Sequence, residues 1–231
     1  MRNIALSIVV ALVVIILFAT NPNQNLGLAS QKRTLTRPAC HRPRIIPRFL
    51  TAKECQAVMD TALKQGLSRS EVVGTDDNEV SDVRTSWQVH LDQSHPAVAR
   101  VFSKAEKLFG IHRTLFESLQ VARYTEGQEY QTHFDSDDET PAHELRSDTL
   151  LIYLNDVDEG GSTHFPKVNV SVSPTTGKAV HWKNLDDRGR VLPCASHGSQ
   201  PVISGEKWIC TVWVNPFEKE KETRRPYGIK K

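Results

Sequence analysis

The stretch RYTEGQEYQTHFD, residues 123–135, contains the most informative pattern in this 231-residue chain. Residues i and i+2 of an extended strand point to the same face. His133 and Asp135 can therefore converge on one metal ion while Phe134 turns away. The pair is weak evidence by itself, because a chain with 9 histidines and 27 acidic residues forms such a triplet by chance. A surface strand is the alternative interpretation, so further ligands are needed.

The C-terminal stretch HGSQPVISGEKWICTVW, residues 197–213, supplies the missing groups. His197 is the best candidate for a third ligand, because two histidines and one carboxylate on one face of an octahedron leave three positions open. That arrangement suits iron(II) enzymes that bind a co-substrate and oxygen together. Lys207 follows ten residues later, and its ammonium can pair with the distal carboxylate of a dicarboxylate. We expect two neighbouring strands joined by a turn to aim both side chains into one cavity. Alone, Lys207 would be interpreted as a solvated edge-strand lysine. The period of two adds three residues to the same face: Ile209, Thr211 and Trp213.

The rest of the chain predicts helices followed by many strands. Thr51 and Glu54 form a capping-box pattern that opens a helix ending at Gly66. A second helix is expected over 96–109, with Ser94 as its cap and Gly110 after its end. β-Branched and aromatic residues predict strands over 119–124, 149–155, 178–182, 200–204 and 207–214. Helices first and strands later predict an α+β, mainly β fold, with helices packed against a sandwich or open barrel.

Four segments, in the right order and with matching internal spacing, resemble the catalytic domain of prolyl 4-hydroxylases of the collagen and plant or algal type. They are RYTEGQEYQTHFD (123–135), RSDTLLIYLNDVDEGGSTHFP (146–166), GKAVHW (177–182) and HGSQPVISGEKWICTVW (197–213). The resemblance covers roughly 44–217, including VRTSW (83–87). It implies a double-stranded β-helix, or jelly roll, that uses iron(II), 2-oxoglutarate and ascorbate. The implied activity is hydroxylation of peptidyl proline, as in procollagen-proline 4-dioxygenases, with decarboxylation of 2-oxoglutarate to succinate.

The resemblance also assigns roles to individual residues. It implies that iron is held by His133, Asp135 and His197. It implies that 2-oxoglutarate is bound by Lys207, with Tyr124 and Thr149 hydrogen-bonded to it and Trp213 as an aromatic wall. Arg146 matches an arginine that contacts the peptide. Ordinary barrel packing is the alternative for Tyr124, Thr149 and Trp213, and Arg84 fits either a peptide contact or a surface salt bridge.

Two departures from the family pattern limit this transfer. The loop SDDETPAHEL (136–145) is short and strongly acidic, which leaves the peptide preference open. Ser199 stands where relatives often carry a cysteine, and Cys194 lies just before His197 instead. The four cysteines allow up to two disulfides in an oxidising compartment, or they are small apolar core residues.

Other functions remain as alternatives: hydroxylation of lysine or another peptidyl residue, nucleic-acid demethylation, a membrane-anchored jelly-roll binding protein without turnover, or a zinc hydrolase. The formal net charge of +2 provides no basic groove, so we expect a peptide or protein substrate and no nucleic acid. No helical-repeat peptide-binding domain precedes the catalytic region, so we expect no obligatory partner subunit.

The N-terminal segment predicts membrane attachment. Residues 4–19, IALSIVVALVVIILFA, carry no charge, Arg2 precedes them, and no basic residue follows until Lys32. The positive-inside rule then predicts an uncleaved signal anchor over 1–20, with the rest of the chain in the lumen of the endoplasmic reticulum. A cleaved signal or a buried helix is the alternative. A polar linker is expected over 21–43, the dioxygenase domain over 44–217 and a charged tail over 218–231.

Overall fold

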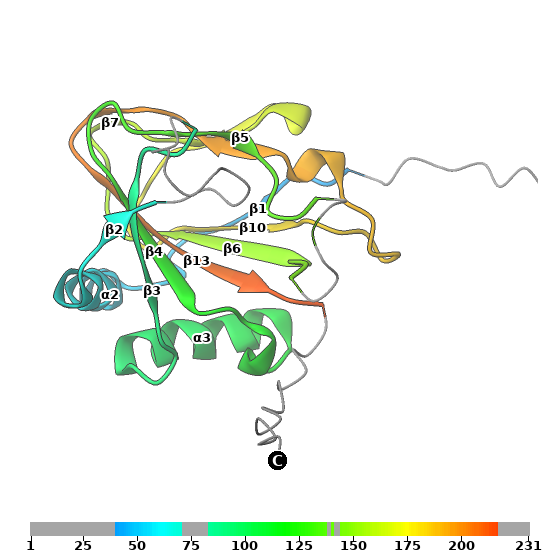
Figure 1. The fold of residues 1–231 in the computed structure, drawn as a ribbon, viewed down its shortest axis with the longest axis horizontal. Helices are drawn as coiled ribbons and strands as arrows, with labels where there is room; N and C mark the ends of the chain where they lie inside the picture. Colours follow the sequence, from blue (N-terminus) through cyan, green and yellow to red (C-terminus); the bar gives the residue numbers. More distant parts are fainter. Residues whose placement is uncertain (1–39, 71–82, 138–139, 141–143, 217–231) are drawn as a thin grey trace, which may run out of the picture. The chain divides into compact units, whose positions relative to one another are not determined.

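Two antiparallel sheets, which face each other, make up most of the described part of the chain. The computed structural model describes residues 40–70, 83–137, 140 and 144–216 (Figure 1). The large sheet contains, in spatial order, β1 (Arg44–Ile46), β10 (Ala179–Lys183), β6 (Asp148–Tyr153), β13 (Lys207–Val214), β4 (Leu119–Tyr124), β3 (Trp87–Leu91) and β2 (Ser68–Arg69). The smaller sheet contains β5 (Tyr130–His133), β11 (His197–Ser199), β8 (Thr163–Phe165) and β9 (Val170–Val172). β12 (Val202–Ser204) and β7 (Glu159–Gly160) form a separate pair. The predicted mainly β fold with facing sheets is confirmed, and each of the five predicted strands is present with small shifts at its ends.

The two predicted helices are present, and the cap of the second differs from the prediction. Helix α2 (Ala52–Gln65) begins with the expected capping box between Thr51 and Glu54. Helix α3 (Pro96–Phe109) is capped by His95, whose Nδ1 accepts a hydrogen bond from the Ala97 amide at 3.3 Å. The prediction of Ser94 as the cap was wrong, because the helix begins at Pro96 and the cap position therefore falls on His95. The Ser94 amide donates to Asp92 Oδ1 in the preceding turn. Pro96 then takes the first helical position, where its missing N–H costs nothing.

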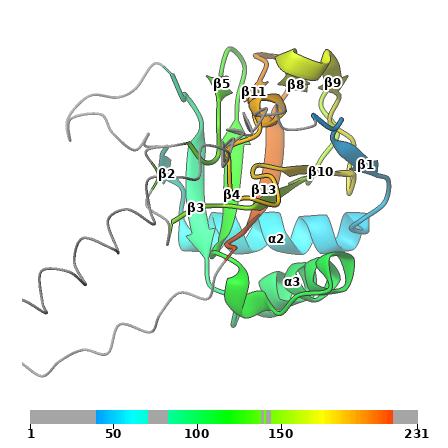
Figure 2. The ribbon, with the colours of Figure 1, turned by 90° about the vertical axis from the view of Figure 1, so that its right-hand side faces the viewer.

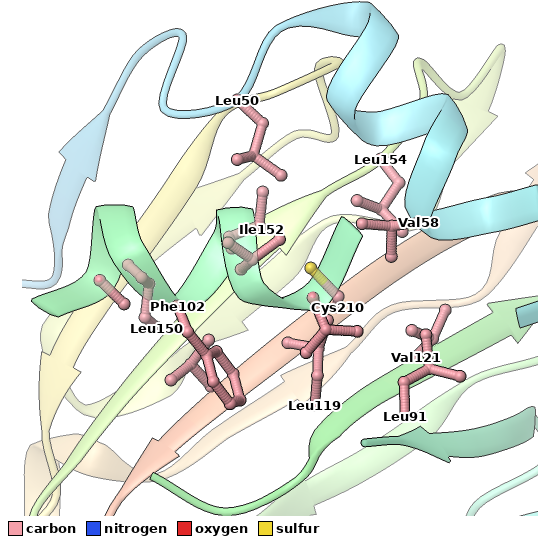
Figure 3. Close-up of a cluster of buried hydrophobic side chains, with 14 of the residues drawn as sticks. Leu50, Val58, Leu91, Phe102, Leu119, Val121, Leu150, Ile152, Leu154 and Cys210 are labelled. Atoms are coloured by element: carbon pink, nitrogen blue, oxygen red, sulfur yellow. The ribbon is translucent and has the colours of Figure 1, made fainter. Parts of the chain in front are cut away.

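Both helices cover the outer face of the large sheet (Figure 2). Val58 of α2 and Phe102 of α3 meet side chains of β6 and β13 there, among them Ile152 and Cys210 (Figure 3). Burying one such apolar side chain contributes about 1.5–3 kcal/mol. This core holds the sheet from behind and leaves its inner face to line a cavity.

Strand β13 shows how the alternation of side chains divides the two faces. All eight of its residues are buried, as expected for a central strand covered on both sides. Its helix-facing residues Trp208, Cys210, Val212 and Val214 belong to the core beneath the helices. The alternate residues, Lys207, Ile209, Thr211 and Trp213, line the cavity on the opposite face.

The four cysteines are free thiols: Cys40 is exposed, and Cys55, Cys194 and Cys210 are buried. Burial raises the pKa of the Cys55 thiol to about 11. The three buried residues thus fit the interpretation as small core residues, and no disulfide joins them.

The predicted signal anchor over 1–20 and the tail over 218–231 lie outside the described residues, as does nearly all of the predicted linker. Within the described ranges, no helix has both the length and the apolar character needed to span a bilayer.

Candidate active site

A cavity of about 930 Å³ lies between the inner faces of the two sheets. The large sheet contributes residues of β3, β4, β6 and β13 to its wall, and the small sheet contributes β5, β8 and β11. All the residues singled out from the sequence line it: Arg84, Tyr124, His133, Asp135, Arg146, Thr149, His197, Lys207 and Trp213. Segments far apart in the sequence are therefore brought to one site.

Three of these residues form a cluster that can hold a metal ion. The ligand atoms of His133, Asp135 and His197 all lie within 4.8 Å of one another. His133 ends β5 and faces His197 across the antiparallel pairing with β11. Asp135 lies two residues beyond the end of β5 rather than within a strand, and its Oδ1 lies 3.8 Å from His133 Nε2. The structure thus brings all three predicted ligands together.

Backbone contacts fix the orientation of both imidazoles. His133 Nδ1 lies 2.8 Å from the carbonyl oxygen of Gln131, and His197 Nδ1 lies 2.8 Å from that of Ala195. A carbonyl only accepts, so each Nδ1 carries the proton and each Nε2 presents a lone pair to the cluster. Gly198 permits this pairing, because a Cβ there would lie 3.0 Å from the carbonyl oxygen of Tyr130 on β5. Metal-binding histidines usually donate their second ring N–H to such an acceptor, which fixes the orientation of the ring.

The electrostatics of the cluster favour the protonation states that bind metal. Burial and the neighbouring His197 lower the pKa of His133 to about 3, so its imidazole is neutral at physiological pH. Burial alone would raise the pKa of Asp135, but the two histidines, Arg146 and the Thr149 hydroxyl lower it below its ordinary value. Neutral imidazoles and an ionised carboxylate are the forms that coordinate a divalent ion.

Thr149 lies at the metal-ligand end of the cavity. Its hydroxyl donates to Asp135 Oδ2 at 2.6 Å and accepts from Asn184 Nδ2 at 2.8 Å. Thr149 is the cross-strand partner of Trp213, six residues along β13 from Lys207. Its expected hydrogen bond to 2-oxoglutarate stays a prediction. The contact that the structure shows is the one to Asp135, a candidate metal ligand.

Lys207 lies at the other end, fully buried with its ammonium in the cavity. Its Nζ donates to Ser199 Oγ at 2.8 Å and lies 5.1 Å from the ring centroid of Tyr124, its cross-strand partner. No acidic side chain pairs with it among the residues that the structure describes, and burial lowers its pKa to about 7. Ser199 follows His197 by two residues on β11, so about 7 Å separate them along the strand. The distance between this ammonium and the metal cluster is thus about the length of a short dicarboxylate.

The strands that carry His197 and Lys207 are arranged differently from the prediction. They do not lie on neighbouring strands joined by a turn, because β11 belongs to the small sheet and β13 to the large one. The two side chains reach the same cavity from opposite walls.

Two wall residues near Lys207, Thr163 and Ser199, were not predicted as site residues from the sequence. Thr163 and Ser199 line the cavity beside Lys207. Behind them, the buried Tyr153 hydroxyl donates to the carbonyl oxygen of Val172 at 2.8 Å and accepts from Thr163 Oγ1 at 2.7 Å. Thr163 and Phe165 share the buried face of β8, whereas His164 between them is half-buried. The same period-two reasoning that selected residues on β13 would have found Thr163 within GGSTHF.

Arg146 lies near the metal cluster, and its guanidinium is held by Glu117 and Trp213. Its Nε and Nη2 donate to the Glu117 carboxylate at 2.9 and 3.0 Å, and its guanidinium carbon lies 3.6 Å from the ring centroid of Trp213. The stacked Trp213 is buried, and its Nε1 has no hydrogen-bond partner among the residues that the structure describes. This guanidinium and the indole together form one wall beside the metal cluster.

Arg84, like Arg146, lies on the cavity wall, and its side chain is buried. Its Nη2 donates to Gln120 Oε1 at 3.0 Å, and its guanidinium carbon lies 4.8 Å from the ring centroid of Tyr130. Tyr130 in turn stacks on His133 with 3.6 Å between ring centroids. The surface salt bridge considered for Arg84 is excluded, because the side chain is buried and has no acidic partner in the described part of the chain.

Comparisons with known proteins give one consistent result. The family model of the 2OG-Fe(II) oxygenase superfamily matches residues 119–215. The chain is 36% identical over 198 residues to prolyl 4-hydroxylase subunit alpha-1 of Homo sapiens, covering 80% of this chain but only 36% of that subunit. It is 31% identical to a putative prolyl 4-hydroxylase of Acanthamoeba polyphaga mimivirus, covering 75% of this chain and 74% of the viral protein.

A solved structure shares the architecture. The viral collagen prolyl hydroxylase from Paramecium Bursaria Chlorella virus-1, solved in complex with 2OG, superimposes with a TM-score of 0.63 at 28% identity. The match covers 75% of this chain and 96% of that one. The jelly-roll arrangement expected from the sequence therefore has a close structural counterpart.

Proposed function

Because the chain belongs to the prolyl 4-hydroxylases of the 2OG-Fe(II) oxygenase superfamily, we propose that it hydroxylates proline residues in a peptide or protein, consuming 2-oxoglutarate and oxygen. The observation that carries the proposal is that the His133–Asp135–His197 cluster shares one cavity with the buried Lys207, which has no acidic partner among the described residues. The names of the relatives, prolyl 4-hydroxylases, support proline as the target.

Iron(II) and 2-oxoglutarate are the metal and co-substrate of this family, and the residues present fit both. Two imidazoles and one carboxylate form the donor set of non-haem iron(II) oxygenases that keep open positions. In the proposal, His133, Asp135 and His197 hold the ion, and Lys207 holds the far carboxylate of 2-oxoglutarate. Ascorbate, which is typical of the family, would keep the metal reduced.

When bound, the ion and co-substrate would supply the oxidative step, in which 2-oxoglutarate loses CO₂, one oxygen atom of O₂ enters succinate and the other enters the substrate as a hydroxyl group. The chain supplies binding and orientation. The Gln131 and Ala195 carbonyls hold the two imidazoles with Nε2 toward the ion. The buried Lys207 ammonium and the Tyr124 ring enclose the dicarboxylate end and exclude water there.

The side of the cavity around Arg146 is proposed to bind the peptide. The guanidinium is fixed by Glu117 and stacked on Trp213, which leaves its Nη1 hydrogens free to donate to a backbone carbonyl. An aromatic face beside such a donor suits a proline ring and the peptide group next to it.

The test measures hydroxylation and succinate together. Purified protein is incubated with iron(II), 2-oxoglutarate, ascorbate and three peptides: polyproline, a collagen-like repeat and a lysine-containing peptide without proline. Mass spectrometry should show a gain of one oxygen on proline, with one succinate per hydroxyl. Hydroxylation of lysine alone would change the substrate, and metal binding without any succinate would favour a binding protein.

Variants of the cluster supply the control for this assay. His133→Ala should abolish both products, since a two-residue set cannot hold the ion in the same geometry. The matched variant is His164→Ala, which removes a half-buried imidazole of β8 that lies outside the cluster. It should retain activity.

We also propose that residues 1–20 anchor the protein in the membrane of the endoplasmic reticulum as a type II protein, with the enzyme domain in the lumen. The uncharged stretch over 4–19 supports this. Alkaline carbonate extraction and protease protection of microsomes test it: the chain should resist both. Release into the soluble fraction, or digestion of the domain in intact vesicles, would contradict the proposal.

A further inference from the structure

The Asp135 carboxylate is held by a short chain of buried side chains that the proposed reaction does not use directly. Asn184 Nδ2 donates to Thr149 Oγ1 at 2.8 Å, and Thr149 Oγ1 donates to Asp135 Oδ2 at 2.6 Å. Thr149 is almost fully buried and Asn184 completely so. Water therefore does not compete for either contact.

The direction of this chain follows from the donors available. A hydroxyl has one hydrogen, and an amide nitrogen donates but does not accept. Because Asn184 Nδ2 donates to the oxygen of Thr149, the single hydroxyl hydrogen of Thr149 is left for Asp135. The bond to a charged oxygen is short, as charge-assisted hydrogen bonds are.

The side-chain amide of Asn184 makes no other hydrogen bond in the described structure. Its Oδ1 is buried without a hydrogen-bond partner in the described structure, and its Nδ2 hydrogen bond goes to Thr149. An unpaired buried carbonyl costs free energy, so Asn184 lowers the stability of the fold relative to an apolar residue of similar shape. That cost is consistent with a role for Asn184 in orienting the threonine.

We infer that Asn184 and Thr149 are positioning residues that engage one oxygen of Asp135 and present the other to the metal. The imidazoles have their backbone carbonyls for the same purpose, and this pair completes the set for the third ligand. A carboxylate that coordinates through one oxygen leaves a position on the ion open for the co-substrate. The inference rests on the proposed metal site and concerns how that site is tuned.

The test uses cobalt(II), which does not turn over, and measures its dissociation constant by calorimetry without 2-oxoglutarate. Thr149→Val keeps the shape and removes the hydroxyl, so cobalt should bind about 10–100-fold more weakly. Thr149→Ser restores the hydroxyl and should recover most of the affinity. Asn184→Leu should weaken binding less than Thr149→Val, because the threonine hydroxyl remains.

A second readout separates positioning from general damage to the fold. The visible absorption of bound cobalt reports its coordination, and it should change in Thr149→Val if both carboxylate oxygens gain access to the ion. The matched control is Thr61→Val, which removes a buried hydroxyl on α2 that bonds only to its own helix at Ala57 O. It should leave affinity and spectrum unchanged.

The outcomes are distinguishable from failure of the proposed function. If the unaltered protein binds no cobalt, the metal site itself is wrong. If it binds cobalt and Thr149→Val binds equally well with the same spectrum, the positioning role is overturned. Equal losses in Thr149→Ser and Thr149→Val would likewise overturn it, because the hydroxyl would not be the cause.

Discussion

Lys207 Nζ and Ser199 Oγ, which come from opposite sheets, meet at 2.8 Å in the interior of the domain. The hydroxyl is a neutral partner, so the protonated form of Lys207 has no counter-ion among the described residues. Burial of an unpaired charge is costly unless an anion arrives. This contact therefore marks the end of the cavity where a carboxylate is expected to bind.

Removal of that ammonium should reduce the affinity for 2-oxoglutarate. In Lys207→Ala the far carboxylate loses a buried charged partner, which costs about 2–5 kcal/mol, or at least about 30-fold in affinity. Calorimetric titration with 2-oxoglutarate on the cobalt-loaded protein measures this. Lys178→Ala is the matched control, because Lys178 Nζ bonds to Ser173 O at an exposed site. Unchanged affinity in Lys207→Ala would remove Lys207 from the proposal.

The same affinity should depend on pH. The pKa of Lys207 is lowered to about 7 by burial, and only the protonated form pairs with a carboxylate. Binding of 2-oxoglutarate should therefore be strongest below pH 7. Above pH 7, the affinity should fall by up to about tenfold per pH unit. Titrations from pH 6 to 9 test this. Lys207→Arg stays charged throughout and should give a flat profile, whereas a flat profile in the unaltered protein would contradict the prediction.

Replacement of Lys207 by an apolar residue should stabilise the ligand-free fold. The pKa falls from 10.5 in the unfolded chain to about 7 in the folded one, so below pH 7 the charge costs at most roughly 5 kcal/mol. Between pH 7 and 10.5 the unfolded state binds more protons, so the stability of the unaltered protein rises with pH. Lys207→Met should therefore show its largest gain in unfolding free energy near pH 6 and a smaller one near pH 9. Urea unfolding at the two pH values measures both; a loss of stability at pH 6 would be inconsistent with an unpaired buried charge.

Arg146 should affect peptide binding without affecting 2-oxoglutarate. Arg146→Gln removes a charged donor beside Trp213, and loss of one such hydrogen bond raises the KM for peptide about tenfold or more. The KM for 2-oxoglutarate and the succinate formed without peptide should stay near their original values. Steady-state kinetics with each substrate varied in turn measures the two KM values separately. Equal increases in both constants would indicate general disturbance of the cavity.

Much of the site could be predicted from the sequence because its signals are local. The alternation of strands placed Lys207, Ile209, Thr211 and Trp213 on one face of β13, and that face lines the cavity. His133 and Asp135 needed only a separation of two residues. His197 was reached through the expected iron(II) donor set and the resemblance to a family. Residues whose partners lie within a few positions in the chain, such as Thr51 and Glu54, were predicted for the same reason.

Only the tertiary structure decided which residues stand at each end of the cavity. The register of β6 against β13 pairs Thr149 with Trp213, and its hydroxyl donates to Asp135, a contact that the sequence did not predict. Thr163 and Ser199, on the opposite sheet, come to lie beside Lys207. Strand alternation specifies the face of a residue, whereas its partner depends on register and on which sheet packs opposite. Those are set by contacts between segments far apart in the chain, and no local pattern records them.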